Sequence, residues 1–462
     1  MRKLLLNLQS ARGNFFALAS TSVFLGLPCA EAQRMIEPPP VGVLRMDGAR
    51  IHHPVADPLR FDLREGIGPD EAGMLAVMLN PTLRAARDRR GLAQAQLIQA
   101  GILPNPQISY TRDFVTGGNT AGTVNAFSYG AGWDVMSLLP LLPKRTAARA
   151  NVRSVDLDIA WQEWQIAQSA RTAVYRVVAR EAQLARAREA DLALQKNAGT
   201  LKKAVEAHQK TVLDLAAAEA TSQDAHAVAL NLEQDVEKQR LVLKKTIGLE
   251  PHAELRFQSG IRLPSSLHPP AEAELVAGLE TGRLDLLALR EGYASQDATV
   301  RAAVLAQFPK IALGFTKISD TSDVHTSGIA ITVDFPIFDR NQGNLATERA
   351  TRQRLVDEYQ NRLFEARSDI ATALADIASL NRQIAAADEA LPLLERLVST
   401  EETAVNEGNA DVLGLYFARS NLLQKRLQLL KLKEQLVEAR TALEIASGRY
   451  LPGALVRTHP KP

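Results

Sequence analysis

The residue types that most often bind metals or catalyse reactions are few in this chain and are not grouped. Only two of the eight histidines are adjacent, and His52-His53 lies in a proline-rich segment without the carboxylate or thiolate pattern of a zinc site. The chain has one cysteine, Cys29, and no H-E-x-x-H, phosphate-binding loop, G-x-S-x-G or strand-linked G-x-G-x-x-G motif. We therefore expect no enzyme, no metal site and no cofactor.

The charge balance argues against a nucleic-acid partner. The 462 residues include 54 basic and 52 acidic side chains, for a formal net charge of +2, whereas nucleic-acid binding depends on a concentrated basic surface. Aromatic residues make up only 5% of the chain. Outside the N-terminus, no apolar run approaches the roughly 20 residues of a membrane-spanning helix.

The first 32 residues have the pattern of a signal peptide. Basic residues accompany an apolar segment over residues 15–27, and an Ala-Glu-Ala site at residues 30–32 would leave Gln33 as the first mature residue. Cys29 follows a proline rather than the small residue of a lipoprotein signal, so we interpret it as part of the discarded peptide, with lipidation as the alternative. The mature chain is then exported and free of cysteine.

Four short segments alternate between apolar and small or polar residues, which is the period of a half-buried β-strand. They span about residues 108–114, 125–136, 311–316 and 328–335. The apolar faces are predicted to contact lipid, through Phe127, Tyr129, Trp133, Ile329, Ile331 and Val333. The other faces carry glycine, alanine and the candidate pore-lining residues Asp113, Asp134 and Asp334. A place at the strand ends, at the water interface, is the alternative for these aspartates.

The length of these segments fits tilted transmembrane strands. Four strands cannot close a barrel, however, and an open sheet edge is not tolerated in lipid. We therefore expect several copies of the chain to complete one barrel. A soluble sandwich would need more strands than four, and the rest of the chain is helical.

The chain contains an internal repeat of about 200 residues. Gly248 corresponds to Gly448 and Asp134 to Asp334 at an offset of 200, whereas residues 83–87 and 106–108 correspond to 286–290 and 309–311 at an offset of 203. Each repeat has a helical stretch (70–100; 272–307), two strands and about 100 helical residues (144–247; 344–447). We divide the chain into a signal peptide (1–32), a proline-rich N-terminal segment (33–69), a first repeat (70–251), a linker (252–271), a second repeat (272–452) and a C-terminal tail (453–462).

Each long helical stretch would span about 150 Å if it were unbroken. Turn-forming residues at 207–211 and 406–411 predict that each stretch folds into an antiparallel hairpin. After the second turn, leucines recur at every seventh position and predict coiled-coil packing: Leu415, Leu422, Leu429, Leu436 and Leu443. Basic residues recur at the same interval on another face, which we expect to be solvated: Arg419, Arg426, Lys433 and Arg440.

The chain resembles the TolC-type outer-membrane efflux protein family over nearly all of residues 70–452. The stretches that carry the resemblance are Asn80-Pro81-Thr82-Leu83-Arg84-Ala85-Ala86, residues 100–106, residues 335–344 and residues 408–419, with Gly448 closing the second repeat. Phe338-Asp339-Arg340-Asn341-Gln342-Gly343-Asn344 is similar to the branch that serves heavy-metal efflux pumps of the cobalt-zinc-cadmium type.

The resemblance implies an α+β membrane protein in a Gram-negative bacterium. In that family a homotrimer forms a twelve-stranded β-barrel in outer-membrane lipid, with four strands per chain, and continues as a long periplasmic α-helical barrel. The implied partners are a periplasmic membrane-fusion adaptor and an inner-membrane RND-type pump. The implied function is passive export of small solutes, either heavy-metal cations or drugs.

By position, the ends of the two helical hairpins correspond to the adaptor-docking tips of the family. The second tip contributes Gly408, Asn409, Asp411 and Val412, and the first, which lacks the glycine, contributes His208, Lys210 and Val212. Asp214 occupies a place in the first repeat where a ring of carboxylates would attract cations. A solvated carboxylate at a helix start is the alternative interpretation of Asp214.

A periplasmic coiled-coil adaptor or scaffold is the alternative function, because it would also have a signal peptide and long hairpins. Its strands would bury their apolar faces in a compact soluble domain. A conduit for protein secretion would share the architecture of the channel.

Overall fold

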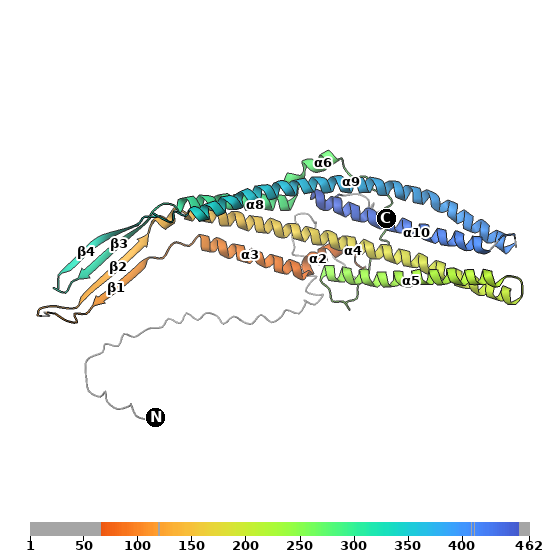
Figure 1. Ribbon diagram of the computed structural model, residues 1–462, viewed down its shortest axis with the longest axis horizontal. Helices are drawn as coiled ribbons and strands as arrows, with labels where there is room; N and C mark the ends of the chain where they lie inside the picture. Colours follow the sequence, from red (N-terminus) through yellow and green to blue (C-terminus); the bar gives the residue numbers. More distant parts are fainter. Residues whose placement is uncertain (1–65, 119–120, 408, 411, 452–462) are drawn as a thin grey trace, which may run out of the picture. The chain divides into compact units, whose positions relative to one another are not determined.

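Two long helical hairpins and one four-stranded sheet dominate the computed structural model (Figure 1), which describes residues 66–118, 121–407, 409–410 and 412–451. Contacts within the chain group residues 62–462 into one unit, to which all of these residues belong. The predicted signal peptide, nearly all of the proline-rich N-terminal segment and the C-terminal tail lie outside the described residues. None of the helices within those ranges is both long and apolar enough to cross a membrane.

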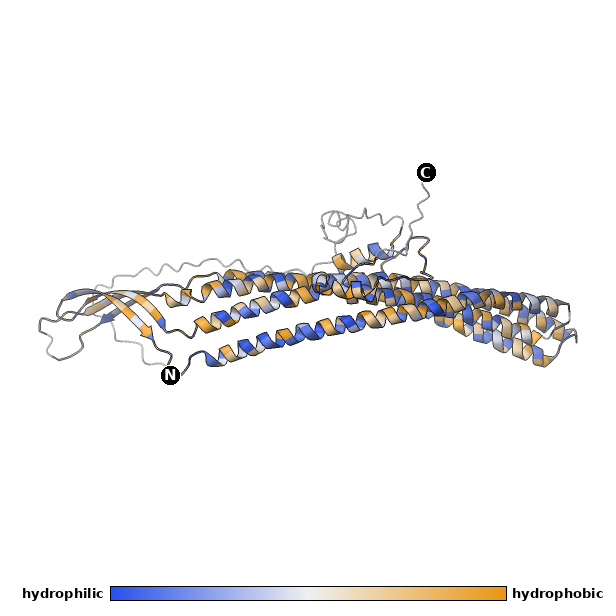
Figure 2. Ribbon diagram, turned by 90° about the horizontal axis from the view of Figure 1, so that it is seen from above, coloured by the Kyte–Doolittle hydropathy of each residue, from blue (hydrophilic) through white to orange (hydrophobic). Residues whose placement is uncertain are grey.

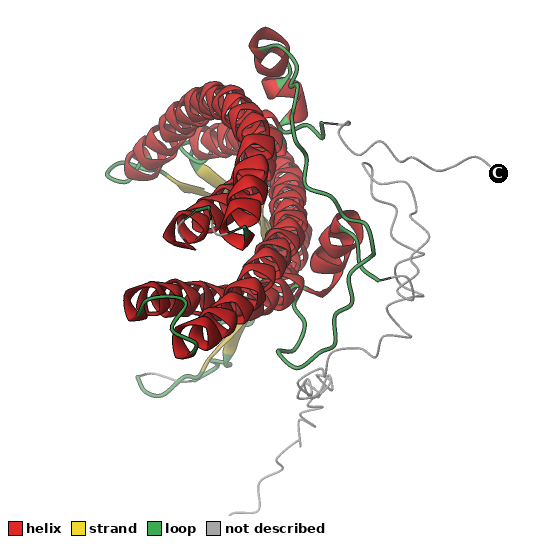
Figure 3. Ribbon diagram, turned by 90° about the vertical axis from the view of Figure 1, so that its right-hand side faces the viewer, coloured by secondary structure: helices red, strands yellow, loops and turns green. Residues whose placement is uncertain are grey.

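The hairpins are α4 (Leu141–Glu206) with α5 (Val212–Ile247), and α9 (Gln342–Asn406) with α10 (Val412–Ser447). Both turns therefore lie where the sequence predicted them. Strong helix formers dominate all four helices, and Pro392 lies inside α9 without ending it. Viewed end on, the two hairpins lie side by side (Figure 3), and they join where α4 packs along α10.

Leu429, Leu436 and Leu443 of the predicted heptad belong to the core that α9 and α10 share. All five leucines of the heptad are buried. In α9, three isoleucines seven residues apart are buried as well: Ile370, Ile377 and Ile384. Complete burial of one such side chain stabilises the fold by about 1.5–3 kcal/mol. The prediction of coiled-coil packing is confirmed for this hairpin.

The basic stripe of α10 is not solvated as expected. Acidic residues of α9 also recur at seven-residue intervals and meet it, so that Arg419 pairs with Glu402, Arg426 with Glu395 at 2.8 Å and Lys433 with Asp388 at 3.7 Å. Arg440 instead pairs with Glu444 of its own helix, with 3.0 Å between the Arg440 Nε and Glu444 Oε1 atoms. The expectation was wrong because a charged stripe beside a coiled-coil seam lies against the neighbouring helix.

Each predicted repeat begins with more than one helix, within the helical stretch that the sequence predicted. The first has α2 (Pro69–Leu79) and α3 (Pro81–Ala100), and the second has α6 (Glu272–Ala277), α7 (Leu279–Gly282) and α8 (Leu284–Leu305). Asn80 is extended, because the proline that follows it disfavours helical backbone. Its side-chain oxygen then caps α3 by accepting from the Thr82 N–H at 2.8 Å.

The two predicted repeats have equivalent contacts at the junction between their short and long helices. The Asn80 amide donates to the Thr246 carbonyl at 2.8 Å, and Arg283 donates to the Ala446 carbonyl at 2.9 Å. Gly248 and Gly448 have positive φ and approach the backbone at Leu79–Asn80 and Gly282–Arg283 respectively. These equivalent contacts join residues that correspond at offsets of 203 and 200.

The sheet contains β1 (Gln107–Asp113), β2 (Ala126–Asp134), β3 (Lys310–Ser319) and β4 (His325–Asp334), in that spatial order and antiparallel throughout. It lies at one end of the unit, and the hairpin turns lie at the other (Figure 1). All four predicted strands are present. β2 is shorter than predicted, because a 3₁₀ turn, η2 (Met136–Leu138), begins two residues after Asp134. β3 and β4 extend further than predicted, to Ser319 and from His325.

Candidate functional site

The predicted lipid-facing residues all lie on one face of the sheet. In the register of the strands, Trp133 is opposite Leu313, which is opposite Ile331, and Ile329 is opposite Phe315. Figure 2 shows hydrophobic residues on the strands, and the apolar side chains of β4 on this face are exposed. A wide apolar face without a covering element is a surface for lipid or for another chain.

Aromatic rings gather on the same face. Tyr110 and Tyr129 have ring centroids 4.9 Å apart, and Phe127 lies 5.6 Å from Tyr129 and 6.3 Å from His325. The indole N–H of Trp133 donates to the Pro104 carbonyl at 2.8 Å, so the ring can enter an apolar medium with its donor satisfied. His325 escaped the sequence analysis because it precedes the predicted strand.

The three candidate pore aspartates lie on the opposite face but are not brought together. Each is the last residue of its strand: Asp113 pairs with Ala126 at the far end of the sheet, whereas Asp134 and Asp334 lie at the end nearer the helices. The Asp134 carboxylate accepts the Met136 and Ser137 N–H groups at 3.1 and 3.2 Å. It therefore caps the turn that follows β2.

The first hairpin tip is closed by local backbone bonds and a capping box. His208 has a φ of +58°, and the Gln209 N–H reaches the Ala204 carbonyl at 2.8 Å. The Asp214 N–H donates to the Thr211 hydroxyl, and the Thr211 N–H donates to the Asp214 carboxylate, both at 3.1 Å. Hydrogen bonds from Thr211 hold the pKa of Asp214 below its usual value. Asp214 thus stays charged and has a capping role.

The second tip has the same closing bond but a different exposed surface. The Asn409 N–H donates to the Ala404 carbonyl at 2.8 Å, while Gly408 and Asp411 lie outside the described residues. Val212 in the first tip is 73% exposed, but its equivalent Val412 is only 7% exposed. Val412 packs with Tyr416 against α4 and α5. In this arrangement Val412 is not available to a docking partner, whereas His208 and Val212 are exposed and Lys210 is half-buried.

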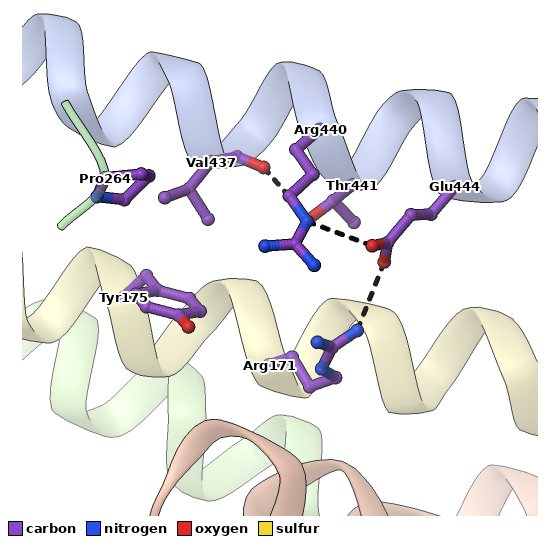
Figure 4. Close-up of a pocket in the computed structure, with 7 residues that line it drawn as sticks. All are labelled: Arg171, Tyr175, Pro264, Val437, Arg440, Thr441 and Glu444. Carbon is purple, nitrogen blue, oxygen red and sulfur yellow. Dashed lines mark hydrogen bonds and ion pairs between the residues drawn. The ribbon is translucent and has the colours of Figure 1, made fainter. Parts of the chain in front are cut away.

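A buried charge cluster joins α4 to α10 and was not predicted. Glu444, only 1% exposed, accepts from Arg171 at 3.1 Å and from Arg440 at 3.0 Å (Figure 4). Arg171 also pairs with Asp70 at 2.8 Å. Burial lowers the pKa of Arg171, but Glu444 and Asp70 outweigh it, so that this pKa is raised overall. The small cavity beside the cluster measures about 20 Å³, which is room for one water molecule.

The contacts of the cluster are structural rather than catalytic. The partners of Glu444 tie α4 to α10 and to Leu451, whose N–H also donates to Glu444 at 3.3 Å. Within the ranges that the structure describes, no group of three or more histidine, cysteine, aspartate and glutamate side chains is placed to hold a metal ion. Within these ranges, the candidate functional sites are two surfaces: the apolar face of the sheet and the exposed ends of the hairpins.

Part of the chain matches one family of known proteins. The family model described as "Outer membrane efflux protein" matches residues 277–449. The "Cation efflux system protein CusC" of Escherichia coli O6:H1 (strain CFT073) is 29% identical over 160 residues, which is 32% of this chain and 35% of the relative. The match therefore spans about a third of the length of this curated relative.

The fold is shared with solved channels over most of the chain. A crystal structure of CusC superposes with a TM-score of 0.70 at 22% identity and covers 83% of this chain and 93% of that one. The Campylobacter jejuni CmeC outer membrane channel superposes with a TM-score of 0.71 at 15% identity, covering 82% and 85%. The chain is similar to the outer membrane efflux proteins in sequence over residues 277–449 and to solved outer-membrane channels in fold.

Proposed function

We propose that this chain is the outer-membrane channel subunit of a tripartite efflux system. Three copies would complete a twelve-stranded barrel in the lipid and a helical barrel in the periplasm. Small solutes would pass through it without energy input from the channel itself. A periplasmic adaptor and an inner-membrane RND-type pump would deliver them.

The observation that carries this proposal is the four-stranded sheet with an apolar face and two open edges. β1 and β4 end the sheet, and unpaired strand edges cannot remain open in lipid. Closure by further copies satisfies the edges and presents Tyr129, Ile329 and Ile331 to the membrane. The resemblance of the fold to outer-membrane channels supports the same arrangement.

The internal organisation and the sites belong to the same proposal. We infer duplication of an ancestral half, with repeats at 70–251 and 272–452 joined by the linker 252–271. Asp134 and Asp334 would stand at the entrance where the barrel meets the helices, and Asp113 at its outer mouth. The hairpin tips would dock the adaptor, with His208, Lys210 and Val212 from the first hairpin and Asn409 from the second.

The cargo is proposed to be a heavy-metal cation or a small drug. The name of the curated relative, a cation efflux protein, favours the cation. A strain that lacks the gene should then lose resistance to metal salts such as those of cobalt, zinc or cadmium. Loss of resistance to organic drugs alone would assign the channel to a drug pump.

The test of the channel function uses two neighbouring residues of β4 on opposite faces. Ile331→Asp places a charge in lipid, at a cost of about 2–4 kcal/mol near the bilayer midplane, and should remove the protein from the outer-membrane fraction and abolish efflux. Thr332→Asp faces the lumen and should insert normally. Normal insertion and efflux of both variants, or release of the wild-type protein without detergent, would overturn the proposal.

A further inference from the structure

One face of the sheet is apolar near the helices and becomes basic and aromatic toward its far end. Near the helices, Trp133 is opposite Leu313, and Leu313 is opposite Ile331. Toward the loops that end the sheet (Figure 1), the same face carries Lys317 and Arg112. In the described strands, the surface proposed to face lipid therefore has cations at one end only.

The first row that carries a cation crosses β1, β2 and β3. Tyr110 is opposite Tyr129, and Tyr129 is opposite Lys317. The rings of the two tyrosines lie 4.9 Å apart, and both side chains are more than half exposed. Lys317 is exposed and has no ion pair with any described residue. A charge on the lipid face of a barrel is costly at the bilayer midplane but costs little at the headgroups, so Lys317 marks the headgroup level.

The second row lies nearer the loops and takes one residue from each strand: Arg112, Phe127, Ser319 and His325. The guanidinium group of Arg112 lies 5.4 Å from the centre of the Phe114 ring. Like the lysine of the first row, Arg112 has no ion pair within the described ranges. Two unpaired cations thus lie on the same face, in neighbouring rows.

One polar atom of the second row has no partner. Ser319 is only 1% exposed, and its hydroxyl makes no hydrogen bond with a described residue. In the register, Ser319 lies between Phe127 and His325, whose ring centroids are 6.3 Å apart. A buried hydroxyl without a partner is unfavourable. An acceptor oxygen that entered between the two rings would remove this cost.

We propose that this end of the sheet binds a phosphorylated lipid of the outer leaflet. The inference rests on the proposed function, which puts the far end of the sheet at the outer surface of the membrane. Arg112 and Lys317 would pair with phosphate oxygens, because charge-assisted hydrogen bonds are the strong ones. Ser319 and His325 would supply further donors, and the acyl chains would lie along the apolar rows nearer the helices.

The spacing of the two cations fits a headgroup with more than one phosphate. Neighbouring strands lie about 4.8 Å apart, and residues follow one another along a strand at about 3.4 Å. The backbones at Arg112 and Lys317 are therefore roughly 12 Å apart, across two strands and one row. The apolar rows beside the cations add a hydrophobic contribution that a lipid can use and a free phosphate ion cannot.

One carboxylate faces the proposed site. In the turn between β3 and β4, Asp320 accepts the Ser322 and Val324 N–H groups at 2.8 and 2.9 Å. The Asp323 carboxylate, in contrast, lies 3.7 Å from the imidazole of His325. Asp113, at the end of β1, lies on the opposite face, with Ala126 opposite it. Asp323 is thus the acidic group that would repel a phosphate.

Binding is measured on the purified full chain in detergent, after bound lipid has been removed and with a chelator present. The probes are lipid A with both phosphates, the same lipid after dephosphorylation, and inorganic phosphate. The wild type should bind lipid A at least about tenfold more tightly than the dephosphorylated form, and inorganic phosphate should not compete. Arg112→Gln with Lys317→Gln should weaken binding of lipid A by roughly tenfold or more and leave binding of the dephosphorylated form unchanged.

Two further variants and one control fix the cause of any loss. Arg112→Lys with Lys317→Arg keeps both charges and should bind lipid A like the wild type. Asp323→Asn should tighten binding, and asparagine tolerates the φ of +64° at this position. Lys310→Gln with Arg382→Gln is the matched control, because it removes the same two charges from the opposite face of β3 and from α9. It should leave binding unchanged.

Equal affinity of the wild type for the two forms of the lipid, an equal loss in the matched control, or displacement of lipid A by inorganic phosphate would overturn the inference. So would coverage of this face by another copy, seen as association of wild-type particles that lipid A does not reverse. If the double variant does not reach the membrane, Lys317→Gln alone should show the same direction of change. Resistance of each strain is measured in parallel: normal efflux by a chain that does not distinguish the two lipids rejects only this site, and lipid selectivity without efflux rejects only the channel function.

Discussion

At the scale of single residues, the buried carboxylate of Glu444 is the feature that most needs compensating partners. Two guanidinium groups and one backbone N–H compensate it, and they come from α4, α10 and the segment after α10. A buried ion is tolerated only when its partners are all present. The cluster therefore fixes how the second hairpin sits on the first.

Removal of this carboxylate should be costly. Glu444→Leu leaves Arg171 and Arg440 without their shared partner, and loss of one member of a buried pair costs about 3–5 kcal/mol. Glu438→Leu is the matched control, because its pair with Arg176 in the same seam is partly exposed and such pairs contribute at most about 1 kcal/mol. The free energy of unfolding in detergent separates them, and equal losses would contradict the role given to Glu444.

The capping box of the first tip predicts a dependence on pH. Thr211 holds the pKa of Asp214 below its usual value, so the cap stabilises the tip above that value and loses its effect as the pH falls through the lowered pKa. Thr211→Ala should cost about 1 kcal/mol and speed amide exchange of the residues after Thr211 at neutral pH. The difference from the wild type should shrink in strong acid. Thr221→Ala, within the same helix, should leave exchange at the tip unchanged at either pH.

Residue roles were predictable from the sequence only where neighbours in the chain decide them. The alternation of the strands predicted that Trp133 and Ile331 lie on one face. The residues adjacent to the three aspartates were enough to suggest the alternative, that each aspartate lies at the end of its strand. The pairing of Arg171 with Glu444 joins positions 273 residues apart, and no local pattern indicates it. The burial of Val412 likewise depends on how α10 lies against the first hairpin.

At the scale of elements, the sequence predicted the long helices, their seam and the helical stretch at the start of each repeat, but not the breaks that divide those stretches into shorter helices. Leucines every seventh residue required a partner helix, and α9 supplies it. The break at Asn80 has a local cause in the following proline and was predictable in principle. The breaks at Gly278 and Arg283 have weaker signals, because Arg283 is extended in a position that its contact with the Ala446 carbonyl defines.

The leucine seam yields a prediction at this scale. Leu436 is fully buried between α9 and α10, so Leu436→Ala should lower the free energy of unfolding by about 2–5 kcal/mol. Leu393 is an exposed leucine of α9, and Leu393→Ala should change the free energy of unfolding by less than about 0.5 kcal/mol. Thermal unfolding monitored by far-UV circular dichroism distinguishes the two. Similar shifts for both would mean that other copies cover Leu393.

At the scale of the whole molecule, exposed apolar side chains occur at both ends of the described unit. At one end they form the sheet face that the proposed barrel would turn to lipid. At the other they include Val212 and Leu213 at the first hairpin tip. The proposed passage from an inner-membrane pump to the outside needs a contact surface at each end, and substitutions can remove each surface without the other.

Val212→Asp with Leu213→Asp should leave the protein in the outer membrane and abolish efflux. Burial of one such side chain in an interface is worth about 1.5–3 kcal/mol, so affinity for the adaptor should fall by roughly tenfold or more. Leu192→Asp, at an exposed leucine of α4 away from the turn, is the control and should keep both insertion and resistance. Adaptor binding by the purified channel and the resistance of the strain are measured together. Unchanged binding and resistance in the double variant would show that the first tip is not the docking surface, and the adaptor would then have to recognise the second hairpin.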